Sequence, residues 1–104
     1  MSDERLRELE ARLKRISVRL LPRLKVERRI DEADFAELFA CLDEIKDFTF
    51  QKTDISRSLV SKLFHMFFLI NRDISFVPLS RERNEVWSRL ITTLAAIFDD
   101  HQFS

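Results

Sequence analysis

Apolar side chains recur at three- and four-residue spacing in four stretches of the chain, which are separated by polar or proline-containing segments. The repeating positions are Leu6, Leu9, Leu13, Ile16 and Leu20; Phe35, Leu38, Phe39, Leu42 and Ile45; Ile55, Leu59, Leu63, Met66, Phe67 and Ile70; and Val86, Leu90, Leu94 and Ile97. This spacing places each set on one face of a helix, where the sets can form a shared core. The pattern therefore predicts an all-α, compact helical bundle.

The limits of the first two helices follow from proline and from capping residues. The first helix should run from about Asp3 to Leu21. Pro22 should end or kink it, because proline lacks an amide proton and restricts the residue before it. Asp31 or Asp34 should cap the second helix, since a carboxylate can accept the free amide protons of a first turn.

The third helix has an apolar face that is unusually wide. It should begin at Thr53 or Asp54, and Phe64, Phe68 and Leu69 extend its apolar stripe almost around the helix. Such a helix either lies at the centre of the bundle or is partly covered by a partner. We predict the central position.

The segments between these helices can also be placed. Phe48 and Phe50 alternate with polar residues in a short connection before the third helix. Residues 71–79 are apolar but should form a loop, and Ser80 is a suitable cap for the last helix. Residues 99–104 should fray.

Length and composition favour a single domain, residues 1–104, in a reducing compartment. The chain has 104 residues, no glycine and one cysteine. Without glycine, tight hairpins and phosphate-binding loops are not expected. A lone thiol forms no internal disulfide, and we identify neither a secretory signal nor an apolar run long enough for a membrane helix.

The net charge is zero, but the charges are unevenly distributed. Residues 1–31 carry ten basic and six acidic side chains, residues 32–54 two and seven, and residues 55–104 six and five. The basic region is either a solvated helix face or a docking surface for an acidic partner. Arg15 and Arg19 are the residues that we expect to attract such a partner.

Groups for catalysis or metal binding are sparse. His65 and His101 have no second ligand at helical metal spacing. We predict that His65 is a hydrogen-bonded structural histidine, and that Cys41, which has leucines as neighbours, is a buried and inert thiol. The sequence therefore predicts no enzyme, no metal site and no cofactor.

Residues 42–59 resemble the N-terminal domain of transcription elongation factor TFIIS. The matching residues are Leu42, then Ile45-Lys46-Asp47-Phe48, then Thr53-Asp54-Ile55-Ser56-Arg57-Ser58-Leu59. Members of that family carry a similar leucine-rich helix, a short connection and a comparable helix start. Here Ser56 replaces the usual glycine and Val60 the usual asparagine.

The front half of the chain is similar to a related fold, the integrase-binding domain of lens epithelium-derived growth factor. Its motif is matched by Leu24-Lys25-Val26, by Ile30-Asp31 and by Ala40-Cys41-Leu42-Asp43-Glu44-Ile45. In that domain the Ile-Asp pair contacts partner peptides. Apolar residues of a second loop, which lies near an Arg-Arg pair, contact them as well. The resemblance assigns comparable roles to Ile30, Asp31, Arg72, Ile74 and Phe76.

Both resemblances imply a right-handed bundle of four or five helices in a nuclear protein of transcription elongation or chromatin. Such domains bind short, disordered, often acidic segments with an apolar anchor. We expect Ile30 and Phe76 to form the walls of one pocket between two loops, with Asp31 as the anchor for the partner's backbone amides.

Two other functions compete with this one. The leucines of the first helix could form a dimeric coiled coil, although fewer than three heptads precede Pro22. Residues 12–29 could bind nucleic acid, but aromatic residues do not interleave with the basic ones. We therefore favour a monomeric peptide-binding domain with no membrane contact and no nucleic-acid partner.

Overall fold

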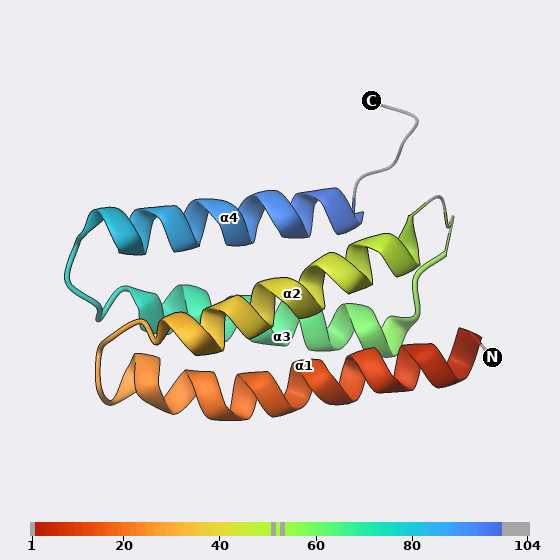
Figure 1. Ribbon diagram of the computed structural model, residues 1–104, viewed down its shortest axis with the longest axis horizontal. Helices are drawn as coiled ribbons and strands as arrows, with labels where there is room; N and C mark the ends of the chain where they lie inside the picture. Colours follow the sequence, from red (N-terminus) through yellow and green to blue (C-terminus); the bar gives the residue numbers. More distant parts are fainter. Residues whose placement is uncertain (1, 51, 53, 99–104) are drawn as a thin grey trace.

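The computed structural model describes residues 2–50, 52 and 54–98. Within these ranges the chain forms four helices and no strand (Figure 1). They are α1 (Ser2–Lys25), α2 (Glu32–Thr49), α3 (Arg57–Ile74) and α4 (Arg81–Phe98). The predicted all-α bundle of four to five helices is confirmed, with four.

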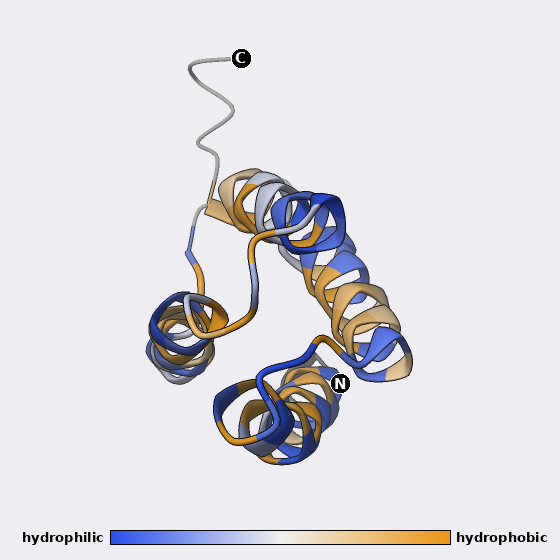
Figure 2. Ribbon diagram, turned by 90° about the vertical axis from the view of Figure 1, so that its left-hand side faces the viewer, coloured by the Kyte–Doolittle hydropathy of each residue, from blue (hydrophilic) through white to orange (hydrophobic). Residues whose placement is uncertain are grey.

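The helices pack in an order that differs from their order along the chain. α1 packs against both α2 and α3, and α2 packs against α4. Each helix runs opposite to the preceding one, so the neighbours α1 and α3 are parallel, as are α2 and α4 (Figure 1). Figure 2 shows the four helices grouped around a common centre, with apolar and polar residues alternating around each coil.

The core contains most of the positions that the apolar spacing selected. The fully enclosed large side chains are Leu9, Leu13, Leu20, Leu24, Leu38, Leu42, Ile45, Leu59, Leu63, Met66, Ile70 and Leu90. They come from all four helices, so no helix can leave the bundle without exposing apolar surface. Leu6, Ile55, Phe67 and Val86 are only partly buried at its margin.

The predicted end of the first helix at Pro22 is wrong. α1 continues to Lys25, and the Val26 amide donates to the Pro22 carbonyl over 2.8 Å. The bond that proline cannot make would have gone to the carbonyl of Val18, whose side chain is exposed, so water can replace the missing donor. Leu24 is fully buried and holds the extra turn against the core.

Two helix starts were predicted correctly and one was not. Asp31 caps α2, its Oδ1 accepting from the Asp34 amide at 3.0 Å. Ser80 caps α4, its Oγ accepting from the Arg83 amide at 3.1 Å. α3 begins later than predicted, with Ser56 as its cap. Of the two residues predicted to open α3, Asp54 lies before the helix, and Thr53 lies outside the described residues.

Helices replace parts of two predicted connections. α2 includes Phe48 and ends at Thr49, whose hydroxyl donates to the Ile45 carbonyl at 2.9 Å. α3 runs to Ile74, so only the second half of the predicted 71–79 loop is a loop. The predicted fraying of residues 99–104 lies outside the described residues.

The prediction that the third helix is central was also wrong. α3 contributes Leu59, Leu63 and Met66 to the core, but it leaves Phe64 45% and Phe68 60% exposed. It lies at the side of the bundle against α1. Its wide apolar stripe therefore has a buried face and a solvent-facing one.

Candidate functional site

A ladder of ion pairs joins α1 to α2. On one face of α1, Arg5, Arg12, Arg19 and Arg23 turn toward the acidic residues of α2 and its cap. Arg5 Nη2 lies 2.7 Å from Glu44 Oε1, and Arg12 also pairs with Glu44. Because the two helices are antiparallel, arginines further along α1 meet acids nearer the start of α2.

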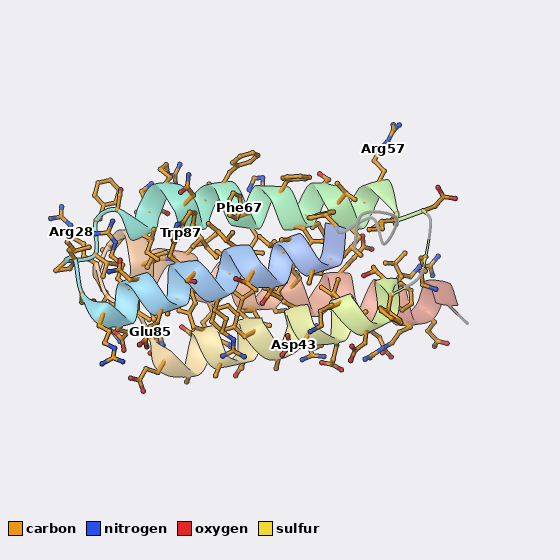
Figure 3. The ribbon with its side chains drawn as sticks, turned by 90° about the horizontal axis from the view of Figure 1, so that it is seen from above. Arg28, Asp43, Arg57, Phe67, Glu85 and Trp87 are labelled. Carbon is orange, nitrogen blue, oxygen red and sulfur yellow. The ribbon has the colours of Figure 1, made fainter. Side chains whose placement is uncertain are left out.

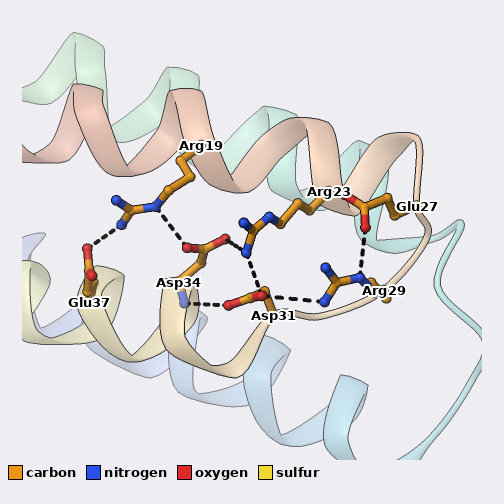
Figure 4. Close-up of polar contacts among 7 residues, drawn as sticks. All are labelled: Arg19, Arg23, Glu27, Arg29, Asp31, Asp34 and Glu37. Atoms are coloured by element: carbon orange, nitrogen blue, oxygen red, sulfur yellow. Dashed lines mark hydrogen bonds and ion pairs between the residues drawn. The ribbon is translucent and has the colours of Figure 1, made fainter.

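The densest part of the ladder surrounds Asp34, which is buried (Figure 4). Arg19 Nε donates to Asp34 Oδ1 at 2.8 Å, and Arg23 Nη1 to Asp34 Oδ2 at 3.2 Å. Arg19 also pairs with Glu37. A buried carboxylate must be compensated by donors of this kind, so these arginines help to hold the bundle together.

The ladder lowers the pKa of carboxylates at both of its ends. The pKa of Glu44 is held below its ordinary value, mainly by the hydrogen bond from Arg12 and then by that from Arg5. The pKa of Asp31 is lowered first by the hydrogen bond from the Asp34 amide and then by the nearby charge of Arg23. Both groups are therefore stabilised as anions.

These contacts correct the predicted role of two residues. Asp31 is not a free anchor, because its Oδ1 accepts the Asp34 amide and its Oδ2 lies 2.5 Å from Arg23 Nη1 and 3.4 Å from Arg29 Nη1. Arg19 likewise forms ion pairs within the molecule, with Asp34 and Glu37. Of the two arginines expected to attract a partner, Arg15 is exposed and makes no ion pair with any described residue.

The predicted pocket between the two loops also changes. Ile30 and Ile74 are buried in the core, so neither is a free apolar wall. Phe76 is 49% exposed, and Arg28 lies over its ring at 5.9 Å from the centroid. The contact of Arg28 with Phe76 places the two loops side by side at one end of the bundle, where Figure 3 shows Arg28, but Ile30 and Phe76 do not form the two predicted walls of a pocket.

Arg72, the last of the predicted site residues, pairs with its neighbour in sequence. Its Nε lies 2.8 Å from Asp73 Oδ1, and Asp73 is buried. This contact raises the pKa of Arg72, so the side chain stays charged. More than half of the arginine side chain remains in water.

A groove between α1 and α3 is the feature that the sequence did not reveal. It has a volume of about 550 Å³. Leu13 and Met66 are the deepest of its lining residues, and Val18, Leu21 and Leu69 are apolar residues nearer the surface. The groove exists because short side chains, including Ser17 and Ser61, line it where larger ones would fill the space between the two helices.

The charged groups of the groove are basic. Lys14 comes from α1 and Lys62 from α3, and the imidazole of His65 also lines the groove; no carboxylate lines it among the described residues. Lys62 Nζ donates to Ser58 Oγ at 3.0 Å and lies 3.9 Å from Glu10 Oε1. Lys14 makes no ion pair within the described part of the chain. The groove therefore joins an apolar floor to positive charge.

The predictions for Cys41 and for the two histidines differ in how well they agree with the structure. Cys41 is fully buried, as predicted, and burial raises the pKa of its thiol. His65 is exposed in the groove and forms no hydrogen bond with a described residue, so its predicted structural role was wrong. His101 lies outside the described residues. Among the described residues, no group of three or more potential ligands could hold a metal ion.

Comparisons with known proteins identify no relative. No protein family, curated protein or solved structure matches the chain significantly. The resemblance to the TFIIS and integrase-binding domains therefore stays a prediction. None of the helices within the described residues is long and apolar enough to cross a membrane.

Proposed function

We propose that this domain is a protein-interaction module that binds acidic segments carrying an apolar anchor in the groove between α1 and α3. The observation that carries the proposal is that Lys14 and Lys62 lie beside an apolar floor, with no carboxylate in the lining among the described residues. An acidic segment complements that charge, and its apolar side chain fills the space.

The two parts of the groove have different tasks in this proposal. A leucine or phenylalanine placed in the groove against Val18, Leu21 and Leu69 leaves water, which contributes roughly 1.5–3 kcal/mol. The lysines contribute more to encounter and orientation than to affinity, because they are in contact with water. Binding should therefore depend on the anchor at all salt concentrations and on the lysines mainly at low salt.

Two observations weaken the alternative functions considered for the basic first helix, nucleic-acid binding and coiled-coil dimerisation. Arg5, Arg12, Arg19 and Arg23 face carboxylates of α2 and its cap, which leaves less positive charge for nucleic-acid phosphates. The leucines of α1 that could form a coiled coil are buried within the bundle instead. Peptide binding at the groove can use the charge of Lys14, which makes no ion pair with a described residue, whereas Lys62 already lies 3.9 Å from Glu10 Oε1.

The test uses a fluorescent peptide rich in aspartate and glutamate with a single phenylalanine, and its variant with alanine in place of that phenylalanine. Lys14→Glu should weaken binding about three- to tenfold at low salt, and loss of the anchor about tenfold or more. Arg15→Glu is the matched control, because it makes the same charge change at the neighbouring exposed position, which does not line the groove.

Two results would contradict the proposal. The first is an equal loss of affinity in Lys14→Glu and Arg15→Glu, because only general charge would then matter. The second is a set of amide chemical-shift changes centred on Arg28 and Phe76, which would place the peptide at the loop end of the bundle.

We also propose a nuclear setting in the transcription elongation or chromatin machinery. This part rests only on the resemblance of residues 42–59 and of the front half of the chain to domains of that machinery. Imaging of the tagged chain in cells, together with proximity labelling by groove-intact and Lys14→Glu forms, tests it. A cytoplasmic protein whose labelled neighbours include no transcription factors would refute this setting.

A further inference from the structure

A second exposed apolar surface lies where α3 meets α4, and aromatic stacking organises it. The Phe64 ring stacks on Phe98 of α4 at 5.2 Å and on Phe68 at 5.9 Å between ring centroids. Phe67 stacks on Trp87 of α4 at 5.5 Å, and Figure 3 shows this pair between the two helices. We call Phe64, Phe67, Phe68, Ile91 and Phe98 the aromatic face.

This face leaves much apolar surface in water. Phe64, Phe68 and Ile91 are exposed by 45%, 60% and 42%. With about 200 Å² for a phenylalanine side chain, the two rings alone expose about 200 Å². A shallow hollow of about 200 Å³ between the helices is lined only by apolar residues. Exposed apolar patches of a few hundred Å² are often functional, so this surface is a candidate interaction site.

The aromatic face is separate from the α1–α3 groove. On α3, Lys62, His65 and Leu69 line the groove, whereas Phe64 and Phe68 point away from it. The apolar hollow of the face has no charged lining residue, so it offers nothing to orient an acidic segment. The two surfaces thus suit different partners.

We propose that the aromatic face is the contact between two copies of this chain, related by a two-fold axis. In such an interface the same patch occurs on both sides, so any charge near the axis faces its own like charge. The centre of this face avoids that cost because it is uncharged. The exposed charges of α3 on this side lie toward its ends, at Arg57, which Figure 3 shows pointing into solvent, and Arg72.

The available area indicates a weak dimer. Two exposed rings and Ile91 supply an apolar centre, but a stable interface buries about 800 Å² on each partner. Ala95 of α4, which also lines the hollow, adds contact area without a strong anchor. We therefore expect a Kd of about 10–500 µM, in place of the monomer that the sequence alone favoured.

Sedimentation velocity of the intact chain between about 10 µM and 1 mM tests the proposal, because a weak dimer forms by mass action. The wild type should shift from monomer to dimer across this range. Phe68→Glu should raise the dimer Kd about tenfold or more, since it places two like charges in an apolar contact. Leu79→Glu is the control, because Leu79 is 76% exposed but lies in the loop before α4, outside the aromatic face. The dimer Kd of this variant should match that of the wild type.

Concentration-dependent amide shifts should also cluster on α3 and α4. Circular dichroism first checks that Phe68→Glu is folded, and Ile91→Asn replaces it if it is not. A wild type that stays monomeric at 1 mM overturns the proposal. So does a dimer that tolerates a folded Phe68→Glu or Ile91→Asn variant, or one whose shifts cluster on α1 and α2.

Discussion

The burial of Leu42 makes a quantitative prediction about stability. Leu42 is fully enclosed in the core from the inner face of α2. Leu42→Ala removes about three carbon groups, worth roughly 0.8 kcal/mol each, and leaves a cavity that a packed core closes only in part. We therefore expect a loss of about 3–5 kcal/mol from a total stability of roughly 5–15 kcal/mol. Leu63→Ala should cost a similar amount, because Leu63 is equally enclosed on α3.

Urea unfolding monitored by circular dichroism measures this loss. With a denaturant slope of about 1.5 kcal/mol per molar, the midpoint should fall by roughly 2–3 M, unless the variant is already unfolded in buffer. Leu79→Ala provides the control, because the same atoms are removed from a largely exposed side chain and the change should stay within about 0.5 kcal/mol. If Leu42→Ala unfolded at the same urea concentration as Leu79→Ala, the assigned inner face of α2 would be wrong.

The remaining predictions concern the ion-pair ladder. Arg19→Glu should lower the melting temperature, because it places a third carboxylate beside Asp34 and Glu37. Arg15→Glu should leave the melting temperature nearly unchanged. Equal melting temperatures of the two variants would contradict a stabilising role of the Arg19 ion pairs. Acid should destabilise the domain, because the pKa of Glu44 is lower in the folded state than its ordinary value of 4.5. The contribution of Glu44 to folding stability is therefore complete above pH 4.5 and is lost as the pH falls through the pKa of the folded state. Urea unfolding from pH 7 to 3 should show this loss, and Glu44→Gln should reduce the slope.

Local patterns in the sequence were sufficient to predict the four helices, although not all of their ends. Apolar spacing selects the buried side of each helix because a helix repeats every 3.6 residues whatever it packs against. The caps at Asp31 and Ser80 are equally local, since each side chain accepts an amide proton from its own first turn. Burial of Cys41 followed from its leucine neighbours.

Only the tertiary structure decided which surfaces remain available. The charge excess of residues 1–31 and its opposite in residues 32–54 looked like a docking surface, but antiparallel packing of α1 on α2 pairs much of it within the molecule. The extension of α1 past Pro22 depends on Leu24 reaching a core built by other helices. Ile30 and Asp31 were assigned to a binding loop, and the bundle uses both internally.

The groove and the aromatic face could not be predicted from the sequence either. Lys14 and Lys62 are 48 positions apart in sequence and meet only because the parallel helices α1 and α3 are neighbours. The apolar stripe of α3 gave no sign of which part a neighbour would cover. Helical periodicity fixes the direction of a side chain relative to its own helix axis, but burial and charge pairing depend on the helix that lies opposite. That choice is made by the packing of the whole chain.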